Sequence, residues 1–306
     1  MMSSDFELPG TGWKPEKKNR KDLNIEHDQV MPLLEQLPLQ HYLQERKKLP
    51  ASVNLSQWST GVKFQGGFNT CAAHVVATLL GYFEKRAYGR HVPPSRLFLY
   101  KVAKNFLQET GDDGVYIRQV MGVLSAVGVP PEKYWPYLKP GTLTKPNTVD
   151  SRIEVEPTPF CYAVAADYKA IKYYRLDHGK TIDSAALLRR ARSHLASQLP
   201  FAFGIPLFPS ITHATISGKI PYPGQGEKAI GSHAVVAMGY SDRKVVENAS
   251  GIKTRGALLI QNSWSKKWGR EGFGWLPYEY VTGGLANDFW SLTHADWLDT
   301  AKFKLR

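Results

Sequence analysis

The longest regular pattern of apolar positions in the chain begins at Cys71. Apolar residues recur there at intervals of three and four positions: Ala72, Val75, Val76, Leu79, Leu80 and Phe83. This spacing predicts a helix from Cys71 to about Tyr88, which Gly89 ends. Because the helix is apolar on most of its faces, we expect it to be buried. The stretch from Gln65 to Thr70 contains turn-forming residues and predicts a loop that leads into the helix.

The hydrophobic pattern changes character between the two halves of the chain. In the first half, further helices are predicted after Pro94 and from Ile117 to Gly128, and a short edge strand over 52–58. In the second half a helix is predicted over 184–199 and a long loop over 209–231, and short apolar runs indicate strands over 163–168, 171–176, 201–207, 234–240, 256–261 and 272–276. This order predicts an α+β fold of two lobes, a helical lobe over about 60–140 and a β-rich lobe over about 150–290, with the active-site cleft between them.

Residues 1–48 differ from the rest of the chain. As far as Asn24 they combine proline, glycine and mixed charges, which is typical of extended chain with little core of its own. The apolar spacing from Val30 to Leu37 predicts a short amphipathic helix, and a second piece is predicted over 39–49. This N-terminal segment is either a loosely attached tail or a strap that packs on the body across its active site.

Composition narrows the class of protein. With 306 residues, of which 42% are apolar, the chain can bury a substantial core, and two cysteines are too few for a disulfide framework. The net charge of +12 is scattered without a nucleic-acid-binding signature, so we interpret it as a solvated surface and expect no nucleic-acid partner. No signal peptide or membrane-spanning run is visible, which predicts no membrane partner. Localisation stays open between the cytoplasm and export by a non-classical route.

Three polar residues at the ends of predicted elements suggest nucleophilic catalysis. Cys71 lies at a helix N-terminus, where unpaired backbone N–H groups favour a thiolate, although a free cysteine is often only a buried apolar residue. His233 stands at the head of the 234–240 strand, and Asn262 ends the strand over 257–261. Cysteine catalysis needs a thiolate, an imidazole and a group that orients the imidazole. Gln65 and the Cys71 backbone N–H would then stabilise the oxyanion.

These residues together resemble the papain-like cysteine peptidases, over residues 49 to about 290. The resemblance rests on Gln65-Gly66 six residues before Cys71, on His233-Ala234-Val235 leading to Gly239-Tyr240, and on Asn262-Ser263-Trp264 leading to Trp268-Gly269. It implies that Cys71 is the nucleophile, His233 the general acid and base, and Asn262 the residue that orients His233. It also implies that Gln65 is the oxyanion donor and that Trp264 shields the hydrogen bond between Asn262 and His233.

The resemblance has further implications outside these motifs. The backbone at Asp113 and Gly114 would pair with an extended substrate, and residues 1–48 would match the family's prosegment in position, as an intramolecular inhibitor across the cleft. Phe68 and Ala72 stand where the family usually has a disulfide-forming cysteine and a tryptophan. Missing disulfides fit bacterial branches of the family, and the loss of tryptophan leaves room beside Cys71.

The sequence therefore predicts a cysteine endopeptidase that hydrolyses protein or peptide substrates through an acyl-thioester and needs no cofactor or metal. Two alternatives stay open: an acyl transferase or transglutaminase-like enzyme on the same fold, and a catalytically idle binding module. Of the other candidates, His74 is predicted to be a packed core histidine, His213 to line the cleft or to be exposed, and Cys161 to be buried and inert.

Overall fold

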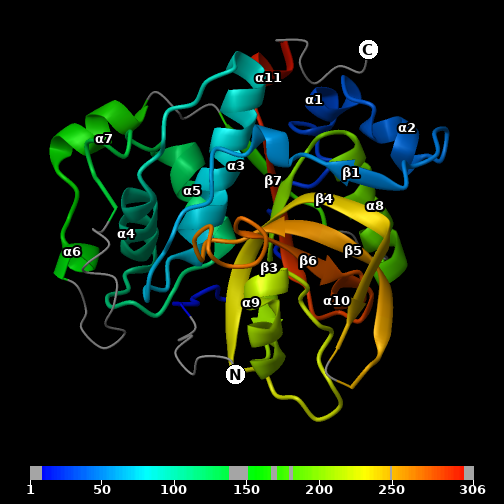
Figure 1. Cartoon of the computed structure of the whole chain (residues 1–306). Coiled ribbons are helices and arrows are strands. Elements are labelled where there is room, and N and C mark those ends of the chain that lie inside the picture. The colour runs from blue at the N-terminus through cyan, green and yellow to red at the C-terminus, as the bar shows by residue number, and fades with distance from the viewer. Residues whose placement is uncertain (1–8, 138–150, 167–170, 179–181, 249, 300–306) are drawn as a thin grey trace.

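The computed structural model describes residues 9–137, 151–166, 171–178, 182–248 and 250–299, and Figure 1 shows a group of helices beside an antiparallel sheet. The predicted α+β architecture of helical and β-rich parts is confirmed. The boundary that the sequence predicted between the lobes, at about 140–150, lies almost wholly outside the described residues.

The described helices fall into three groups. Two short helices belong to the N-terminal segment, α1 (Met31–Glu35) and α2 (Leu39–Leu43). The helical lobe contains α3 (Cys71–Tyr88), α4 (Arg96–Leu107), α5 (Ile117–Ala126), α6 (Ser151–Glu154) and α7 (Pro159–Ala165). The remaining helices accompany the sheet: α8 (Ser184–Ala196), α9 (Ala214–Ser217), α10 (Glu279–Thr282) and α11 (Ala295–Asp299).

The sheet has seven antiparallel strands in the order β2-β7-β3-β4-β5-β6, with β1 paired to β4 beside this path. Their bounds are β1 (Ser52–Asn54), β2 (Lys172–Arg175), β3 (Phe201–Leu207), β4 (Gly231–Glu247), β5 (Lys253–Gln261), β6 (Phe273–Pro277) and β7 (Asn287–Thr293). The long β4 pairs with β1, β3 and β5, so it lies at the centre of the sheet. Its first residues, and the end of β5, carry two of the predicted site residues.

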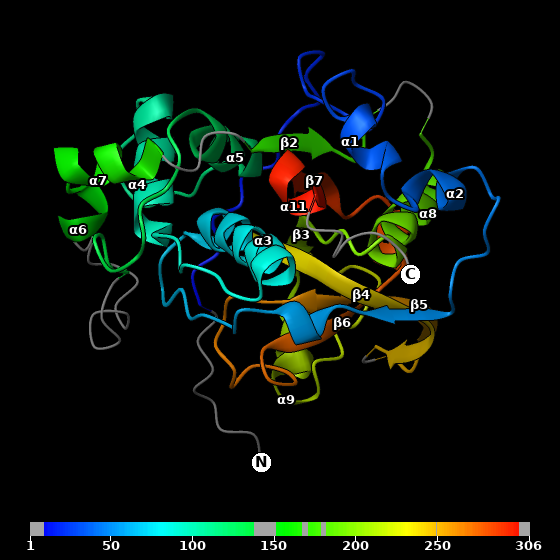
Figure 2. The ribbon, with the colours of Figure 1, turned by 90° about the horizontal axis from the view of Figure 1, so that it is seen from above.

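Helix α3 lies between the other helices and the sheet, where it contacts α4 and α5 on one side and β4 on the other (Figure 2). The predicted burial is confirmed: Cys71, Val76 and Leu79 have no exposed surface. The helix ends where predicted, because Gly89 takes a left-handed conformation with φ +72° that glycine adopts at little cost. The helix is therefore a rigid central support for the residue at its first turn.

In the second half one prediction is wrong and one strand was missed. The expected strand over 163–168 is instead helix α7, as far as the described residues reach, because Pro159 favours a helical first turn and Cys161 and Ala165 pack on the same buried side. Strand β7 was not predicted. It follows Gly283 and Gly284, and its pairing with both β2 and β3 is non-local. Short apolar runs of this kind do not distinguish a strand from a helix.

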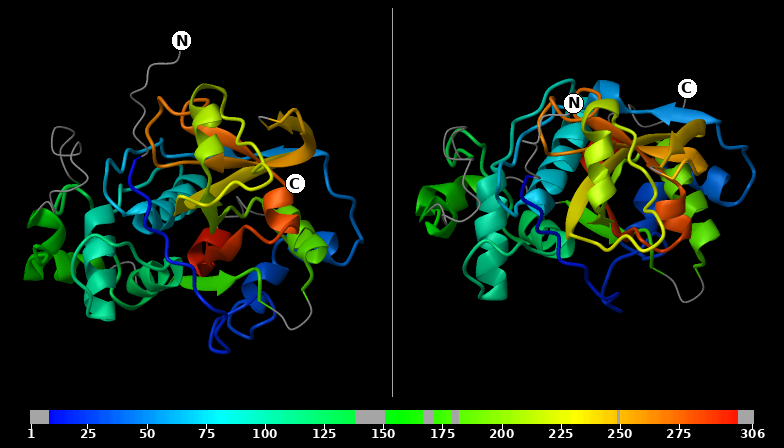
Figure 3. Two further views of the ribbon diagram at one scale, coloured as in Figure 1. Left: turned by 90° about the horizontal axis from the view of Figure 1, so that it is seen from below. Right: turned by 60° about the horizontal axis from the view of Figure 1, so that its bottom comes forward.

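The N-terminal segment, defined here as residues 9–48, packs on the body through buried residues in both of its halves, between Gly12 and Tyr42. Residues 9–24 form an extended thread that Figure 3 shows as a dark-blue trace between the helices and the sheet. Residues 25–48 contain α1 and α2, and α2 packs against α8. Within the described residues, the model contains no helix with the length and apolar character needed to cross a bilayer.

Candidate active site

Cys71 is the first residue of α3, and its side chain is completely buried. Burial raises the pKa of the thiol to about 12, and this outweighs hydrogen bonds to the sulfur from the backbone N–H groups of Ala234 and Trp13, which lower it. The sequence predicted an activated thiol at a helix N-terminus. In this conformation burial therefore favours the protonated thiol.

His233 and Asn262 form a direct hydrogen bond. The distance between His233 Nε2 and Asn262 Oδ1 is 2.8 Å, and the Ser263 backbone N–H donates to the same oxygen at 2.7 Å. An amide oxygen only accepts, so Nε2 carries the proton and Nδ1 has a free lone pair. Burial lowers the pKa of His233 to about 4, although the bond to Asn262 opposes this change. His233 is the third residue of β4, because this strand begins at Gly231 and not at residue 234 as the sequence predicted.

Trp264 covers this pair. Its ring stacks on the His233 ring with centroids 4.6 Å apart and planes tilted by 29°. Trp268 packs edge-on against the Trp264 ring, with the ring centroids 5.7 Å apart. Both tryptophans are buried, so the hydrogen bond between His233 and Asn262 lies in apolar surroundings where it is strong.

Gln65 lies in the loop before α3 and is tied to the sheet through Ser263. The Ser263 hydroxyl donates to Gln65 Oε1 at 2.5 Å, and the Gln65 backbone N–H donates to the Ser263 carbonyl at 2.9 Å. The side-chain amide of Gln65 donates to the carbonyl of Phe68 at 2.8 Å and to that of Gly10 at 2.6 Å. One donor of Gln65 is therefore taken by the N-terminal segment. Ser263 connects both lobes, and sequence reasoning did not single it out for this function.

A second polar network supports the same loop from behind. The Tyr137 hydroxyl donates to the Gln65 carbonyl at 3.0 Å and contacts the Thr70 hydroxyl at 2.6 Å. His74 is buried, as predicted. Arg96 Nη1 donates to His74 Nε2 at 2.9 Å, and His74 Nδ1 contacts the Thr70 carbonyl. These bonds fix the turn that leads into Cys71. These bonds could not be predicted from the sequence, because their partners lie on α3, on α4 and in separate loops.

Directly after Gly114, the backbone of Val115 is paired with the N-terminal segment. The Val115 N–H donates to the Gly12 carbonyl at 3.0 Å, and the Lys14 N–H donates to the Val115 carbonyl at 3.3 Å. A β-carbon at Gly114 would lie 1.9 Å from the Gly12 oxygen, so this close approach requires glycine. The side chain of Asp113 is mainly exposed and binds Lys14 at 3.0 Å.

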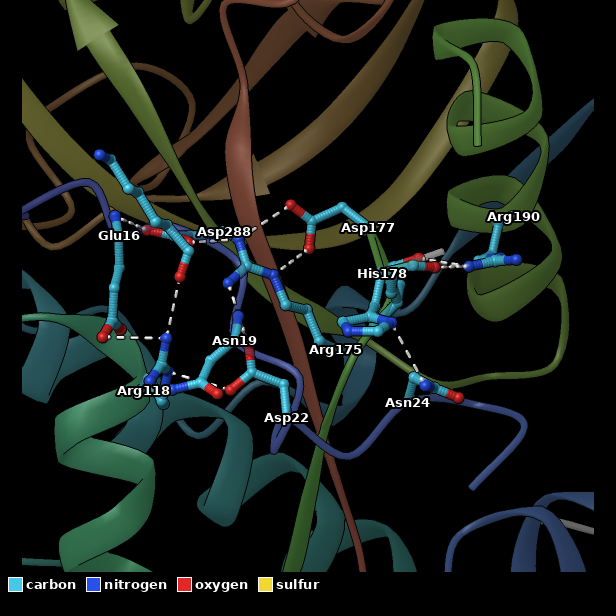
Figure 4. Close-up of polar contacts among 12 residues, drawn as sticks. Glu16, Asn19, Asp22, Asn24, Arg118, Arg175, Asp177, His178, Arg190 and Asp288 are labelled. Carbon is cyan, nitrogen blue, oxygen red and sulfur yellow. Dashed lines mark hydrogen bonds and ion pairs between the residues drawn. The ribbon is translucent and has the colours of Figure 1, made fainter. Parts of the chain in front are cut away.

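Beyond Lys14, the thread is anchored by a buried group of charges that we call the Arg175 cluster (Figure 4). The guanidinium of Arg175 on β2 contacts three carboxylates: Asp177 at 2.7 Å, Asp288 at 2.6 Å and Asp22 at 3.4 Å. Arg118 on α5 adds contacts to Asp22 at 3.1 Å and to Glu16 at 2.9 Å. Two of the four carboxylates belong to the N-terminal segment, so the thread completes the cluster.

The remaining sequence candidates lie elsewhere. His213 lines a cavity of about 270 Å³ with Tyr222, Glu227 and Asn248, and none of the predicted site residues lines that cavity. Cys161 is buried on α7, as predicted, with Thr158 Oγ1 3.4 Å from its sulfur. Across the described residues, no three His, Cys, Asp or Glu side chains are grouped so as to hold a metal ion.

Comparison with known proteins agrees with this fold. Residues 49–289 match the model of the papain family cysteine proteases. An uncharacterized peptidase C1-like protein of Acanthamoeba polyphaga mimivirus is 30% identical over 233 residues, which cover 74% of this chain and 67% of the viral protein. The match of the family model spans most of the chain. The chain therefore belongs to the papain family of cysteine proteases.

Solved structures extend this likeness to the N-terminal segment. Xylellain, a cysteine protease from Xylella fastidiosa, superimposes with a TM-score of 0.72 at 27% identity, over 94% of this chain and 96% of xylellain. A procathepsin B from Trypanosoma congolense has a TM-score of 0.59 at 16% identity, over 93% and 86% of the two chains, and so shows the shared fold.

Proposed function

We propose that the chain is an endopeptidase that uses Cys71, His233 and Asn262 as its catalytic triad and is held inactive by its own residues 9–24. Membership of the papain family supports the class of reaction. The observation that carries the assignment of residues is the hydrogen bond between His233 Nε2 and Asn262 Oδ1, because it leaves His233 Nδ1 free to accept a proton. The Ala234 N–H at the Cys71 sulfur brings the thiol next to His233.

The proposed reaction proceeds in two halves. His233 Nδ1 takes the proton of the Cys71 thiol, and the sulfur attacks the substrate carbonyl carbon to form a tetrahedral oxyanion. His233 then gives the proton to the leaving amine, and the carbon–nitrogen bond breaks to leave a thioester on Cys71. In the second half, His233 removes a proton from water, the hydroxide attacks the thioester, and the acid product leaves as the thiol is restored.

Gln65 is proposed to stabilise the oxyanion together with the Cys71 backbone N–H. Support comes from the amide group of Gln65, whose Oε1 is held by Ser263 so that Nε2 points its hydrogens to carbonyl oxygens. The carbonyl of Gly10 now accepts from this donor at 2.6 Å, where a substrate oxyanion would otherwise accept. Loss of one such donor typically lowers kcat by about 10²–10³.

We propose inhibition by the thread because the thread makes four contacts with groups that a bound substrate would need. Gly10 occupies the donor of Gln65, the N–H of Trp13 is directed to the Cys71 sulfur, and Gly12 and Lys14 pair with the backbone of Val115. The thread also excludes water, which raises the pKa of Cys71 and lowers that of His233, and so disfavours their ion pair.

The path of the thread also supports an endopeptidase. The thread is continuous on both sides of Trp13, from Gly10 beside Gln65 to Lys14 beside Val115. Because the chain crosses the site without ending in it, an extended peptide can be held on both sides of the bond to be cleaved.

An unlocked full-length chain tests the proposed function. A β-carbon on Gly12 would lie 2.3 Å from the Asn69 carbonyl oxygen, and Gly12 has φ +104°, so Gly12→Ala should expel the thread without changing the body. We expect Gly12→Ala to hydrolyse a mixture of extended peptides, and we expect hydrolysis to be lost when Cys71→Ala or His233→Ala is added. Products in which an added amine replaces water would favour the acyl transferase. No reaction and no thiol labelling at Cys71 would favour the idle binding module.

A further inference from the structure

The side chain of Trp13 fills a pocket in the body that is shaped for an indole ring. Trp13 is 4% exposed, although it belongs to a thread with little core of its own. A β-carbon built on Gly204 would have three indole atoms of Trp13 as its nearest neighbours, at 2.0–2.3 Å. Gly204 is a strand residue of β3 without a positive φ, so its backbone does not require glycine. What requires glycine at this position is the volume of the ring.

The far end of the same pocket carries a hydrogen-bond acceptor. Trp13 Nε1 donates to Asp288 Oδ2 at 3.1 Å, and the carboxylate is buried. Asp288 has φ +58°, unusual for a residue other than glycine, and it lies where the pairing of β3 with β7 shifts its register. Such irregularities redirect a side chain and are concentrated at functional sites.

The charges that remain around Asp288 favour a neutral donor over a cation. When the thread leaves, Glu16 and Asp22 leave with it, while Arg175 and Arg118 stay on the body with Asp177 and Asp288. Two positive and two negative charges then balance each other. A lysine or arginine side chain would add an uncompensated charge to a partly buried site, whereas an indole N–H would satisfy the acceptor without one.

The pocket opens directly beside the proposed nucleophile. The backbone N–H of Trp13 is directed to the Cys71 sulfur, and the carbonyl of Trp13 accepts from the Ser232 hydroxyl at 2.5 Å. Ser232 directly precedes His233 in the chain. A residue whose side chain fills this pocket therefore lies within a few bonds of the reacting carbonyl.

We propose that this pocket is the specificity pocket of the enzyme, and that it takes the side chain of a substrate tryptophan, whose indole N–H binds Asp288. The thread then inhibits by presenting the same side chain that the enzyme recognises in its substrates. Gly204 sets the size of the pocket and Asp288 sets its polarity. The inference rests on the proposed peptidase activity, but binding of an indole ring to the pocket can be measured without catalysis.

The first experiment measures substrate preference in full-length chains. Gly12→Ala, assayed with fluorogenic peptides that vary one position at a time, should show at one position a kcat/KM for tryptophan at least about tenfold above leucine and lysine. Adding Gly204→Val should reverse that preference, so that peptides with a smaller side chain at this position are cleaved faster than those with tryptophan. Equal preference in the two chains would overturn the proposal. No cleavage by either chain would instead contradict the proposed function.

The second experiment measures binding of the ring alone. Trp13→Ala in the full chain should bind free indole, detected by calorimetry, and should bind 1-methylindole about tenfold more weakly because that compound has no N–H to donate. The double variant Trp13→Ala, Gly204→Val should bind neither. Absence of indole binding to Trp13→Ala, or equal binding of both compounds, would overturn the pocket assignment whatever the peptidase activity of the chain.

Discussion

The two halves of the N-terminal segment are held to the body by different forces. Residues 9–24 contribute backbone hydrogen bonds, one buried indole and the carboxylates of the Arg175 cluster. Residues 25–48 contribute the buried apolar side chains of α1, α2 and their flanks: Ile25, Val30, Leu34, Leu37, Leu39 and Tyr42. The first half crosses the candidate site, whereas the second half packs on α8.

The contacts that we propose to be inhibitory and the apolar contacts that stabilise the docked segment therefore lie in different halves. When the thread leaves, its backbone hydrogen bonds are exchanged for hydrogen bonds to water at small net cost, because each contributes only about 1 kcal/mol. Arg175 then still has the carboxylates of Asp177 and Asp288 as partners on the body. Apolar burial is lost in full when a helix detaches, at about 25 cal/mol per Å². We therefore expect the thread to leave the site while α1 and α2 stay in place.

The largest expected effect is on the Arg175 cluster. Arg175→Ala would leave three buried carboxylates without their shared partner, which should lower the free energy of unfolding by about 3–5 kcal/mol. The matched control is Arg189→Ala, which removes a pair with the mainly exposed Glu45 in the second half and should cost about 1 kcal/mol or less. Urea unfolding measures both values. Similar losses in the two variants would contradict the division between the halves.

A smaller loss of stability is expected from the second half alone. Leu34 has no exposed surface, so Leu34→Ala should lower the free energy of unfolding by about 2–5 kcal/mol. Leu33→Ala, at a half-exposed position of the same helix, is the control and should cost less. Thiol labelling of Cys71 in the folded Leu34→Ala chain should stay as slow as in the unaltered chain. Fast labelling would mean that both halves leave together.

The third expected effect is a dependence of the thread on pH. Burial raises the pKa of Glu16 above 4.5, and the charges of Asp288 and Asp22 add to this increase while Arg118 opposes it. A carboxyl group whose pKa is raised by docking binds its proton more tightly when docked, so docking should strengthen as the pH falls from 7 towards 4.5. The lowered pKa of Glu109 beside Lys14 acts in the opposite direction, but that pair is partly exposed and screened. The lowered pKa of His233 also acts in the opposite direction, so the effect of Glu16 is measured as the difference between the unaltered chain and Glu16→Gln.

Hydrogen exchange of residues 9–24, corrected for the intrinsic effect of pH, measures this dependence. Relative to Glu16→Gln, the thread of the unaltered chain should be held more tightly as the pH falls, and Glu45→Gln in the second half should behave like the unaltered chain. The same pH dependence in the unaltered chain and in Glu16→Gln would show that the raised pKa of Glu16 is not linked to docking.

The sequence predicted an element or a residue correctly where the signal lay in neighbouring positions of the chain. The buried helix from Cys71, its end at Gly89 and the α+β order follow from periodic apolar positions and were predicted correctly. Strand β7 and helix α7 were missed because short apolar runs take their structure from tertiary partners. In the site, motifs around Gln65, Cys71 and His233 could be found because neighbouring residues carry them.

Other site residues could not be predicted because their meaning lies in contacts across the chain. Ser263 connects Gln65 to Asn262, Gly204 gives space to Trp13, and Asp288 accepts from the same indole. Each pair is separated by well over a hundred residues, apart from the neighbours Asn262 and Ser263. The raised pKa of the thiol was likewise unpredictable, because it depends on burial in the folded chain and not on the helix terminus alone.

The most direct test of the central claim is the rate at which a neutral peptidyl thiol reagent labels Cys71, located by mass spectrometry. Deleting residues 1–48 would also expose the apolar surface of the body that α1 and α2 cover. The point variant Gly12→Ala is therefore the better way to release the thread alone. Gly226→Ala is the control, because Gly226 has a positive φ of 82° and no atom within 4 Å of an added β-carbon.

We predict that Gly12→Ala labels at least about tenfold faster than the unaltered chain, which corresponds to about 1.4 kcal/mol of lost docking. Gly226→Ala should label like the unaltered chain, and Cys161 should stay unlabelled in all three. Equal rates at Cys71 in the three chains would contradict inhibition by the thread.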